Sequence, residues 1–266
     1  MRKEPWFDTA IATLADPQNL RVWSVIVSLF GDLAQKPGDE LSGGALTRII
    51  EPMGIKPEAI RVALHRLRKD GWLDSTRSGR VSSHHLTAFG RAQSAQVTPR
   101  IYARTPHVAP QWHLLIAEDG PGIHTLDDLL LTASYTSLGR NTALGEGPVP
   151  SDVDDLLAFE VTARAVPDWV KARLCPPELV AACADLHTSI SDLLRSRPPG
   201  WHGTQHQVAT LRTLIIHRWR RVVLRHPDLP PVFFPQDWCG PELRQNVFDL
   251  LDKLPSPDLS ALNEKS

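Results

Sequence analysis

Residues 54–73 read Gly-Ile-Lys-Pro-Glu-Ala-Ile-Arg-Val-Ala-Leu-His-Arg-Leu-Arg-Lys-Asp-Gly-Trp-Leu, and this stretch decides the fold of the first part of the chain. Pro57 suits the first turn of a helix, where its missing N–H is not needed, and Gly71 suits the left-handed position after the last turn. Between them, apolar residues recur at helical spacing and predict one buried face: Ile60, Ala63, Leu64 and Leu67. The opposite face is cationic, which suits a helix lying in the major groove of DNA.

The flanking sequence predicts the rest of a winged helix-turn-helix. An almost wholly apolar helix is expected over residues 19–30, followed by a second helix that Ser42 caps and Gly54 ends. Residues 72–86 then predict two strands around a glycine turn. We therefore predict a DNA-binding domain over residues 1–98. Six residues of its third helix and wing are expected to contact DNA: Arg61, His65, Arg66, Lys69, Arg77 and Arg80.

The distribution of charge agrees with this prediction. The whole chain has a formal net charge of -1. Residues 56–91 contain eight Lys or Arg and three acids, whereas residues 106–160 contain one Arg and nine acids. A DNA duplex would attract the first block and repel the second. The alternative is a solvated helix face with no ligand, and the predicted wing and helix order favour DNA binding over it.

The length of 266 residues suits two or three domains. No stretch is long and apolar enough to cross a membrane, and no secretory signal is evident, so a cytoplasmic location is expected. Three widely spaced cysteines fit neither a disulfide framework nor a zinc cluster and indicate a reducing compartment: Cys175, Cys183 and Cys239.

The remaining chain predicts two further domains and an α+β class for the whole protein. Residues 99–174 are expected to form a ferredoxin-like α+β domain with the order β-α-β-α-β. Its strands are expected over 112–117, 144–149 and 159–165, and its helices from Thr125 to about Gly139 and over 151–157. Residues 175–266 are expected to be helical. Helices are predicted from Pro177, over 205–224 and over 242–254, with an irregular proline-rich segment before the last one.

Several segments carry a family resemblance. They are Ser-Leu-Phe-Gly-Asp at 28–32, the stretch 61–73, His-Arg-Trp-Arg-Arg at 217–221, Asp-Leu-Pro at 228–230 and Pro-Gln-Asp-Trp at 235–238. In this order, over roughly residues 20–254, they resemble the phenylacetate-catabolism repressors, or PaaX-like regulators. The resemblance implies a homodimeric repressor that binds double-stranded operator DNA. It also implies a middle domain similar to the Cas2 nucleases and control of an aromatic-acid operon. An acyl-CoA effector such as phenylacetyl-CoA is expected to release the DNA.

Few residues suggest catalysis. His84 and His85 are neighbours on a strand and point to opposite faces, so they cannot share one metal ion. A metal-dependent nuclease built on the middle domain is the alternative function, because four acids there suggest magnesium ligands: Glu118, Asp119, Asp127 and Asp128. A solvated turn and a helix N-terminus explain them more simply. A third possibility is a winged helix that binds protein instead of DNA, which the charge distribution disfavours. We expect no enzyme activity, no metal site and no cofactor.

A second basic run lies near the C-terminus. It contains Arg218, Arg221 and Arg225, and no acid interrupts residues 217–226. Guanidinium groups match phosphate oxygens, so these three residues are candidates for the phosphates of an acyl-CoA. They can equally stabilise the end of a helix or form salt bridges, and we favour that structural role.

Overall fold

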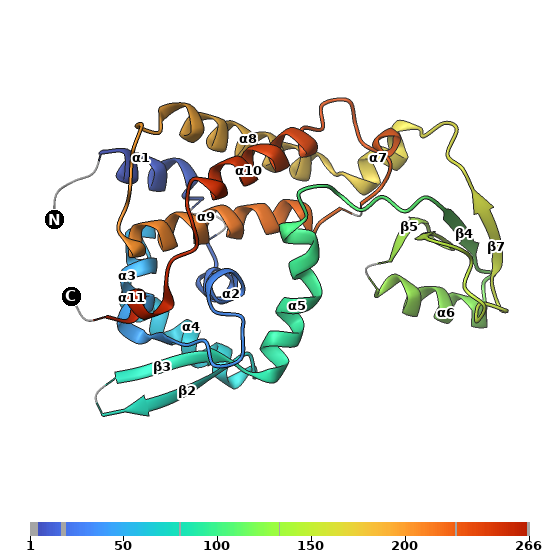
Figure 1. The fold of residues 1–266 in the computed structure, drawn as a ribbon. Coiled ribbons are helices and arrows are strands. Elements are labelled where there is room, and N and C mark those ends of the chain that lie inside the picture. The colour runs from blue at the N-terminus through green and yellow to red at the C-terminus, as the bar shows by residue number, and fades with distance from the viewer. Residues whose placement is uncertain (1–4, 17–19, 80, 133, 227, 265–266) are drawn as a thin grey trace. The chain divides into compact units, whose positions relative to one another are not determined.

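A computed structural model of the chain describes residues 5–16, 20–79, 81–132, 134–226 and 228–264. Figure 1 shows its helices and strands, which form two compact units. The first unit contains Met1–Arg104, Ala184–Arg221 and Gly240–Ser266, and the second contains Thr105–Cys183 and Val222–Cys239. Within the described chain, every helix is too short or too polar to span a membrane.

The first part of unit 1 contains α1 (Pro5–Leu14), α2 (Val22–Leu33), β1 (Leu41–Ser42), α3 (Gly43–Ile50), α4 (Pro57–Lys69), β2 (Leu73–Ser78), β3 (Val81–Leu86) and α5 (Ala88–Tyr102). The predicted helices and strands follow one another in the expected order, whereas the sequence did not predict α1 and β1. The helix boundaries have the expected local causes. Ser42 Oγ accepts a hydrogen bond from the N–H of Ala45 at 3.1 Å, and Gly54 and Gly71 adopt φ of 81° and 74°. The residues expected on the buried face of α4 are buried.

α2 forms the centre of unit 1. Its residues Val25–Phe30 are buried, as the apolar sequence predicts. Figure 1 shows this helix end-on, between α4 and α9 (Gln205–Val223). The β2–β3 ribbon pairs from Leu73↔Leu86 to Ser78↔Val81, and β1 adds a third strand on the β3 side that the sequence did not indicate. The identification of these elements as a winged helix-turn-helix stays a prediction.

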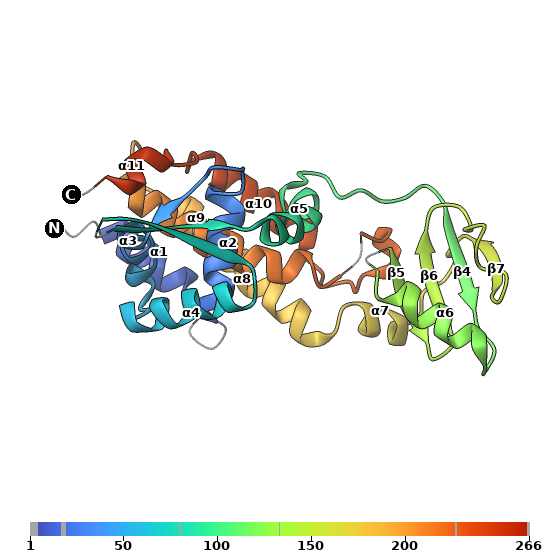
Figure 2. The same ribbon diagram turned by 90° about the horizontal axis from the view of Figure 1, so that it is seen from below.

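Unit 2 contains a four-stranded antiparallel sheet with the order β5-β6-β4-β7 (Figure 2). Its elements are β4 (Trp112–Ile116), α6 (Pro121–Leu130), β5 (Tyr135–Gly139), β6 (Thr142–Glu146), β7 (Leu157–Val161) and α7 (Asp168–Leu174). Side chains of β4 pack alternately into two hydrophobic cores. Leu115 packs with Leu126 of α6, whereas Trp112 and Leu114 pack on the side of Val170 of α7.

Two expectations for this region are wrong. The helix predicted to run to about Gly139 ends at Leu130, because the following residues pair with β6 as strand β5. The helix predicted over 151–157 does not form. Val153 and Leu156 bury their side chains from turns, and the next residues continue as β7. The order is therefore β-α-β-β-β before α7. The ferredoxin-like and Cas2-like identification stays a prediction.

Three C-terminal helices lie close to their predicted positions: α8 (Pro177–Ser196), α9 and α10 (Gly240–Asp252). The short 3-10 turn η2 (Pro231–Phe233) and helix α11 (Leu259–Asn263) were not predicted. The expected domain of residues 175–266 is shared between the two units. One reason is α9, which is buried against the N-terminal helices. Its Trp219 is 1% exposed and donates from Nε1 to the carbonyl of Ile101 in α5 at 2.8 Å.

Candidate nucleic-acid interface

α4 presents a cationic face to solvent. Its buried side chains fix the rotation of the helix against α2, because residues three and four apart share one face. This rotation leaves exposed the four residues predicted to contact DNA: Arg61, His65, Arg66 and Lys69. Figures 1 and 2 place α4 and the β2–β3 ribbon on the same side of unit 1, away from α9.

Two arginines of α4, Arg61 and Arg66, form weak, exposed ion pairs. Arg61 pairs with Glu58 at 2.8 Å, and both side chains are about 70% exposed. Arg66 pairs with Asp70 at 3.5 Å, and its guanidinium lies 5.9 Å from the ring centre of Trp23 in α2. Solvent-exposed ion pairs contribute little stability. Both guanidinium groups can therefore exchange their partners for phosphate at small cost.

Val62 lies within this cationic face and is 70% exposed. The apolar side chain precedes His65 and Arg66 by three and four residues, so all three share one helix surface. We did not predict Val62 as a site residue, although its place opposite the apolar face is visible in the sequence. An exposed β-branched side chain at this position can contact the methyl group of thymine.

Arg77 is the described cationic residue of the predicted wing tip. It is exposed at the end of β2, and its Nε donates to the carbonyl of Gly79 at 3.1 Å. Gly79 has a φ of 60°, as expected for the tip of the turn. Arg80, the second predicted wing residue, lies outside the described residues. The described structure thus exposes five of the six predicted DNA contacts.

The adjacent histidines of β3 point in different directions. His84 is buried and lies 2.8 Å from the Ser75 hydroxyl through Nδ1, whereas His85 is only partly buried. Burial lowers the pKa of His84, and the positive charge of Arg68 and then His85 add to this effect. In the part of the chain that the structure describes, no three metal-ligating side chains gather into a possible metal site.

The acids considered for a nuclease also have simple surroundings. Asp119 accepts a hydrogen bond from Asn141 Nδ2 at 2.9 Å. Asp127 and Asp128 are exposed on α6, and Glu118 is exposed after β4. Their placement agrees with solvated side chains.

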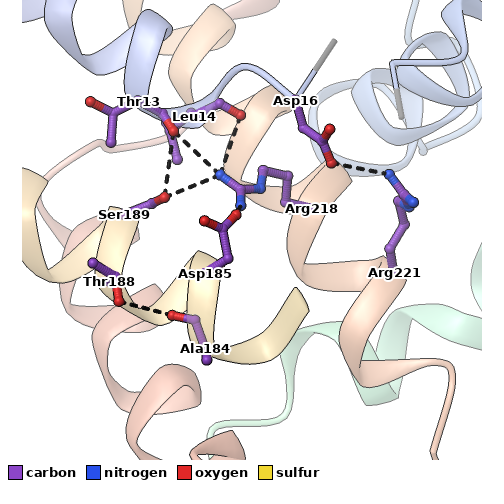
Figure 3. A network of polar contacts seen from close by, with 9 residues as sticks. All are labelled: Thr13, Leu14, Asp16, Ala184, Asp185, Thr188, Ser189, Arg218 and Arg221. Atoms are coloured by element: carbon purple, nitrogen blue, oxygen red, sulfur yellow. Dashed lines mark hydrogen bonds and ion pairs between the residues drawn. The ribbon is translucent and has the colours of Figure 1, made fainter. Parts of the chain in front are cut away.

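Arg218 is a structural side chain of unit 1. It is 8% exposed and pairs with Asp185 of α8 at 2.5 Å (Figure 3). The same guanidinium lies 3.4 and 3.5 Å from the carbonyls of Thr13 and Leu14, at the end of α1, and 3.3 Å from Ser189 Oγ. It therefore joins three helices and satisfies carbonyl groups that the end of α1 leaves without helical partners.

The other two effector candidates also face acids. Arg221 lies 3.8 Å from Asp16, as Figure 3 shows, and Arg225 lies 3.8 Å from Glu178 in unit 2. Each of the three arginines therefore has a carboxylate partner, and they are divided between the two units. This arrangement favours the structural role, and a role in effector binding stays a prediction.

Comparison with known proteins places these features in a family. The model for PaaX-like protein matches residues 21–90, and the model for PaaX-like protein C-terminal domain matches residues 178–257. The transcriptional repressor PaaX of Escherichia coli (strain K12) is 28% identical over 263 residues, which cover 91% of this chain and 83% of the relative. An uncharacterized protein from Mycobacterium tuberculosis has a similar fold, with a TM-score of 0.51 at 20% identity over 87% of this chain and 94% of its own. Since the two family models together match more than half of the sequence, the chain belongs to the PaaX-like protein family.

Proposed function

We propose that this protein is a DNA-binding transcriptional repressor and that residues 20–86 act as a winged helix-turn-helix. The exposed cationic face of α4 is the observation that carries the proposal. The E. coli relative named as a transcriptional repressor supports it, because the similarity extends over most of both chains.

In this proposal α4 enters the major groove. Arg61, Arg66 and Lys69 supply positive charge to bases and phosphates, and His65 supplies a ring nitrogen for hydrogen bonding. Val62 contacts a thymine methyl group. Arg77 and Arg80 contact the phosphate backbone from the ribbon, where they position the helix without reading sequence. The excess of basic residues between 56 and 91 directs this face toward the duplex.

We further propose that two copies bind together. One recognition helix covers few base pairs, and paired copies read half-sites separated by whole helical turns, about 34 Å or a multiple. A surface for self-association is offered by β7, which forms an edge of its sheet. Leu157 and Phe159 on this strand are 58% and 47% exposed. Exposed apolar side chains on a sheet edge are typical of strands that pair with another chain.

The regulated genes and the effector stay predictions of the family resemblance. An acyl-CoA would have to bind the free and the DNA-bound protein with different affinity in order to release the operator. The described contacts of Arg218, Arg221 and Arg225 do not identify a phosphate site for it.

The experiment that tests DNA binding is a gel-shift titration on the promoter fragment upstream of the protein's own gene. We expect specific binding by the natural protein and a loss of at least tenfold in affinity for the Arg61→Ala, Arg66→Ala double variant. The matched control is the double variant Arg104→Ala, Arg195→Ala. It removes two positive charges as well, from exposed side chains that follow α5 and lie in α8. Equal affinities of the two double variants would overturn the role of α4. Cleavage of the fragment in magnesium would favour the nuclease alternative.

A further inference from the structure

Unit 1 contains a cavity of about 170 Å³ between α2, α5 and α9. Apolar side chains, among them Val27 and Ile216, form part of its wall. The rest of the wall is polar and includes Ser28, Ser94 and Arg220. A volume of this size equals that of about five or six water molecules, taken as ~30 Å³ each. The cavity therefore has room for a small organic molecule.

Arg220 brings a positive charge to the cavity without an acidic partner. Its guanidinium donates to Ser28 Oγ at 3.2 Å, and no acidic side chain of the described chain forms an ion pair with it. Burial lowers the pKa of Arg220, as it does for a cation removed from water. Arg218 and Arg221 of the same helix, by contrast, each face a carboxylate. A guanidinium has five N–H donors, and one hydrogen bond of Arg220 is described, to Ser28, so its other donors can serve a ligand.

The nearby carboxylate does not neutralise Arg220. Asp32 is occupied by Arg212, which donates to it from Nε at 2.9 Å and from a terminal nitrogen at 2.8 Å, and by the Tyr102 hydroxyl at 2.6 Å. Burial and Asp32 raise the pKa of Tyr102, while Arg212 and Arg220 oppose that rise, so both guanidinium groups lie near this hydroxyl. Asp32 is thus paired with Arg212, and Arg220 has no carboxylate partner among the ion pairs of the described residues.

Ser94 is a second polar residue of the cavity wall with an incomplete set of contacts. Ser94 is 6% exposed, and its hydroxyl has no hydrogen-bond partner among the described residues. Buried hydroxyl groups are rarely left without one, because the lost hydrogen bond destabilises the fold. The cavity therefore combines an unneutralised guanidinium, an unsatisfied hydroxyl and apolar walls.

We propose that this cavity is a binding site for a small organic carboxylate. The carboxylate group would accept hydrogen bonds from the Arg220 guanidinium, which matches its geometry. It would also accept one from the Ser94 hydroxyl. The short apolar part of the ligand would lie against Val27 and Ile216. A singly charged anion is the matching ligand, because it supplies the one carboxylate partner that Arg220 lacks.

The test is a calorimetric and thermal-unfolding titration of the full chain without DNA, so its result is independent of the proposed repressor function. The probes are propionate and benzoate, with propionamide and benzamide as neutral isosteres and inorganic phosphate as a non-organic anion. We expect saturable binding and a rise in Tm with at least one carboxylate, and neither effect with its amide.

Two variants locate the site. Arg220→Gln removes the cation and is expected to abolish carboxylate binding. Ser94→Ala removes one hydroxyl, leaves the fold intact even if Arg220→Gln does not fold, and is expected to weaken binding about tenfold. The matched control Arg195→Gln changes an exposed arginine of α8 and should bind as the natural protein does.

Three results would overturn the proposal. The first is that neither carboxylate binds. The second is that an amide binds as tightly as its carboxylate or that phosphate alone binds, since either would contradict an organic anion as the ligand. The third is that Ser94→Ala and Arg195→Gln bind with equal affinity.

Discussion

Asp32 and Arg212 form a buried, two-pronged ion pair between helices that lie 180 residues apart in the sequence. Arg212 of α9 donates to both carboxylate oxygens of Asp32 in α2, at 2.8 and 2.9 Å. The two side chains are only 1% and 10% exposed. Arg212 also donates to the carbonyl of Leu254 at 2.6 Å, after α10. The pair therefore ties the N-terminal helices to the C-terminal ones within unit 1.

Replacing Asp32 by Asn is expected to lower the free energy of unfolding by about 3–5 kcal/mol, because it leaves the Arg212 charge buried without its partner. The amide keeps the size of the side chain, so the effect reports charge and not volume. Urea unfolding followed by circular dichroism measures it. Asp192→Asn, which breaks the exposed pair with Arg195, is the control and should change stability little. Equal effects of the two substitutions would contradict a stabilising role for the buried pair.

The sequence predicts α4 well because its signals are local. Pro57, Gly71 and the apolar spacing between them each act within one helix. The partner of Asp32 has no such signal. Asp32 is conspicuous as the charged residue of an otherwise uncharged helix, yet nothing nearby in the sequence identifies Arg212 as its partner. Two-residue β1 escapes prediction for the same reason, since its strand character comes from pairing with β3.

The basic run of α9 shows where residue type alone is insufficient. Arg218 and Arg220 stand two positions apart, and a helix directs such residues to different sides. One guanidinium meets Asp185 and the end of α1, whereas the other meets Ser28 and a cavity. Their different surroundings depend on which helices pack around α9. This packing is a tertiary property that the sequence of the run does not contain.

The salt dependence of DNA affinity should reveal which cations contact phosphate. Each lost phosphate contact is expected to lower the slope of log affinity against log salt concentration by about one unit. We expect this change for Arg77→Ala in the wing. Val62→Ala, in contrast, should leave the slope unchanged and reduce the preference for thymine over deoxyuridine, which lacks the methyl group. Fluorescence anisotropy on one operator duplex measures both quantities. A smaller slope for Val62→Ala, or an unaltered slope for Arg77→Ala, would contradict these assignments.

Arg218→Gln distinguishes a structural arginine from a ligand-binding one. The substitution removes the guanidinium that meets the carbonyls of Thr13 and Leu14, so the end of α1 loses its link to α8 and α9. We expect faster amide hydrogen exchange across Pro5–Leu14, measured by mass spectrometry without any ligand. Arg225→Gln, whose pair with Glu178 lies in unit 2, should leave exchange in α1 unaltered. If amide exchange across α1 is unchanged in Arg218→Gln, Arg218 does not stabilise this helix, and a role in ligand binding is favoured.

His84 should make the stability of the protein depend on pH in mildly acidic solution. Burial, followed by Arg68 and His85, holds the pKa of His84 below its ordinary value of 6.5. The unfolded chain therefore binds a proton at this residue more readily than the folded chain does. The free energy of unfolding must then decrease as the pH falls through 6.5 toward the lower folded pKa, and it must recover as the pH rises again.

His84→Gln keeps a polar side chain near Ser75 and cannot take up this proton. We expect the loss of Tm between pH 7.5 and pH 5.5 to be smaller in His84→Gln than in the natural protein. His107→Gln changes an exposed histidine outside β3, is the matched control and should retain the natural pH dependence. If the Tm of His84→Gln decreases as much as that of the natural protein over this pH range, protonation of another group causes the acid sensitivity.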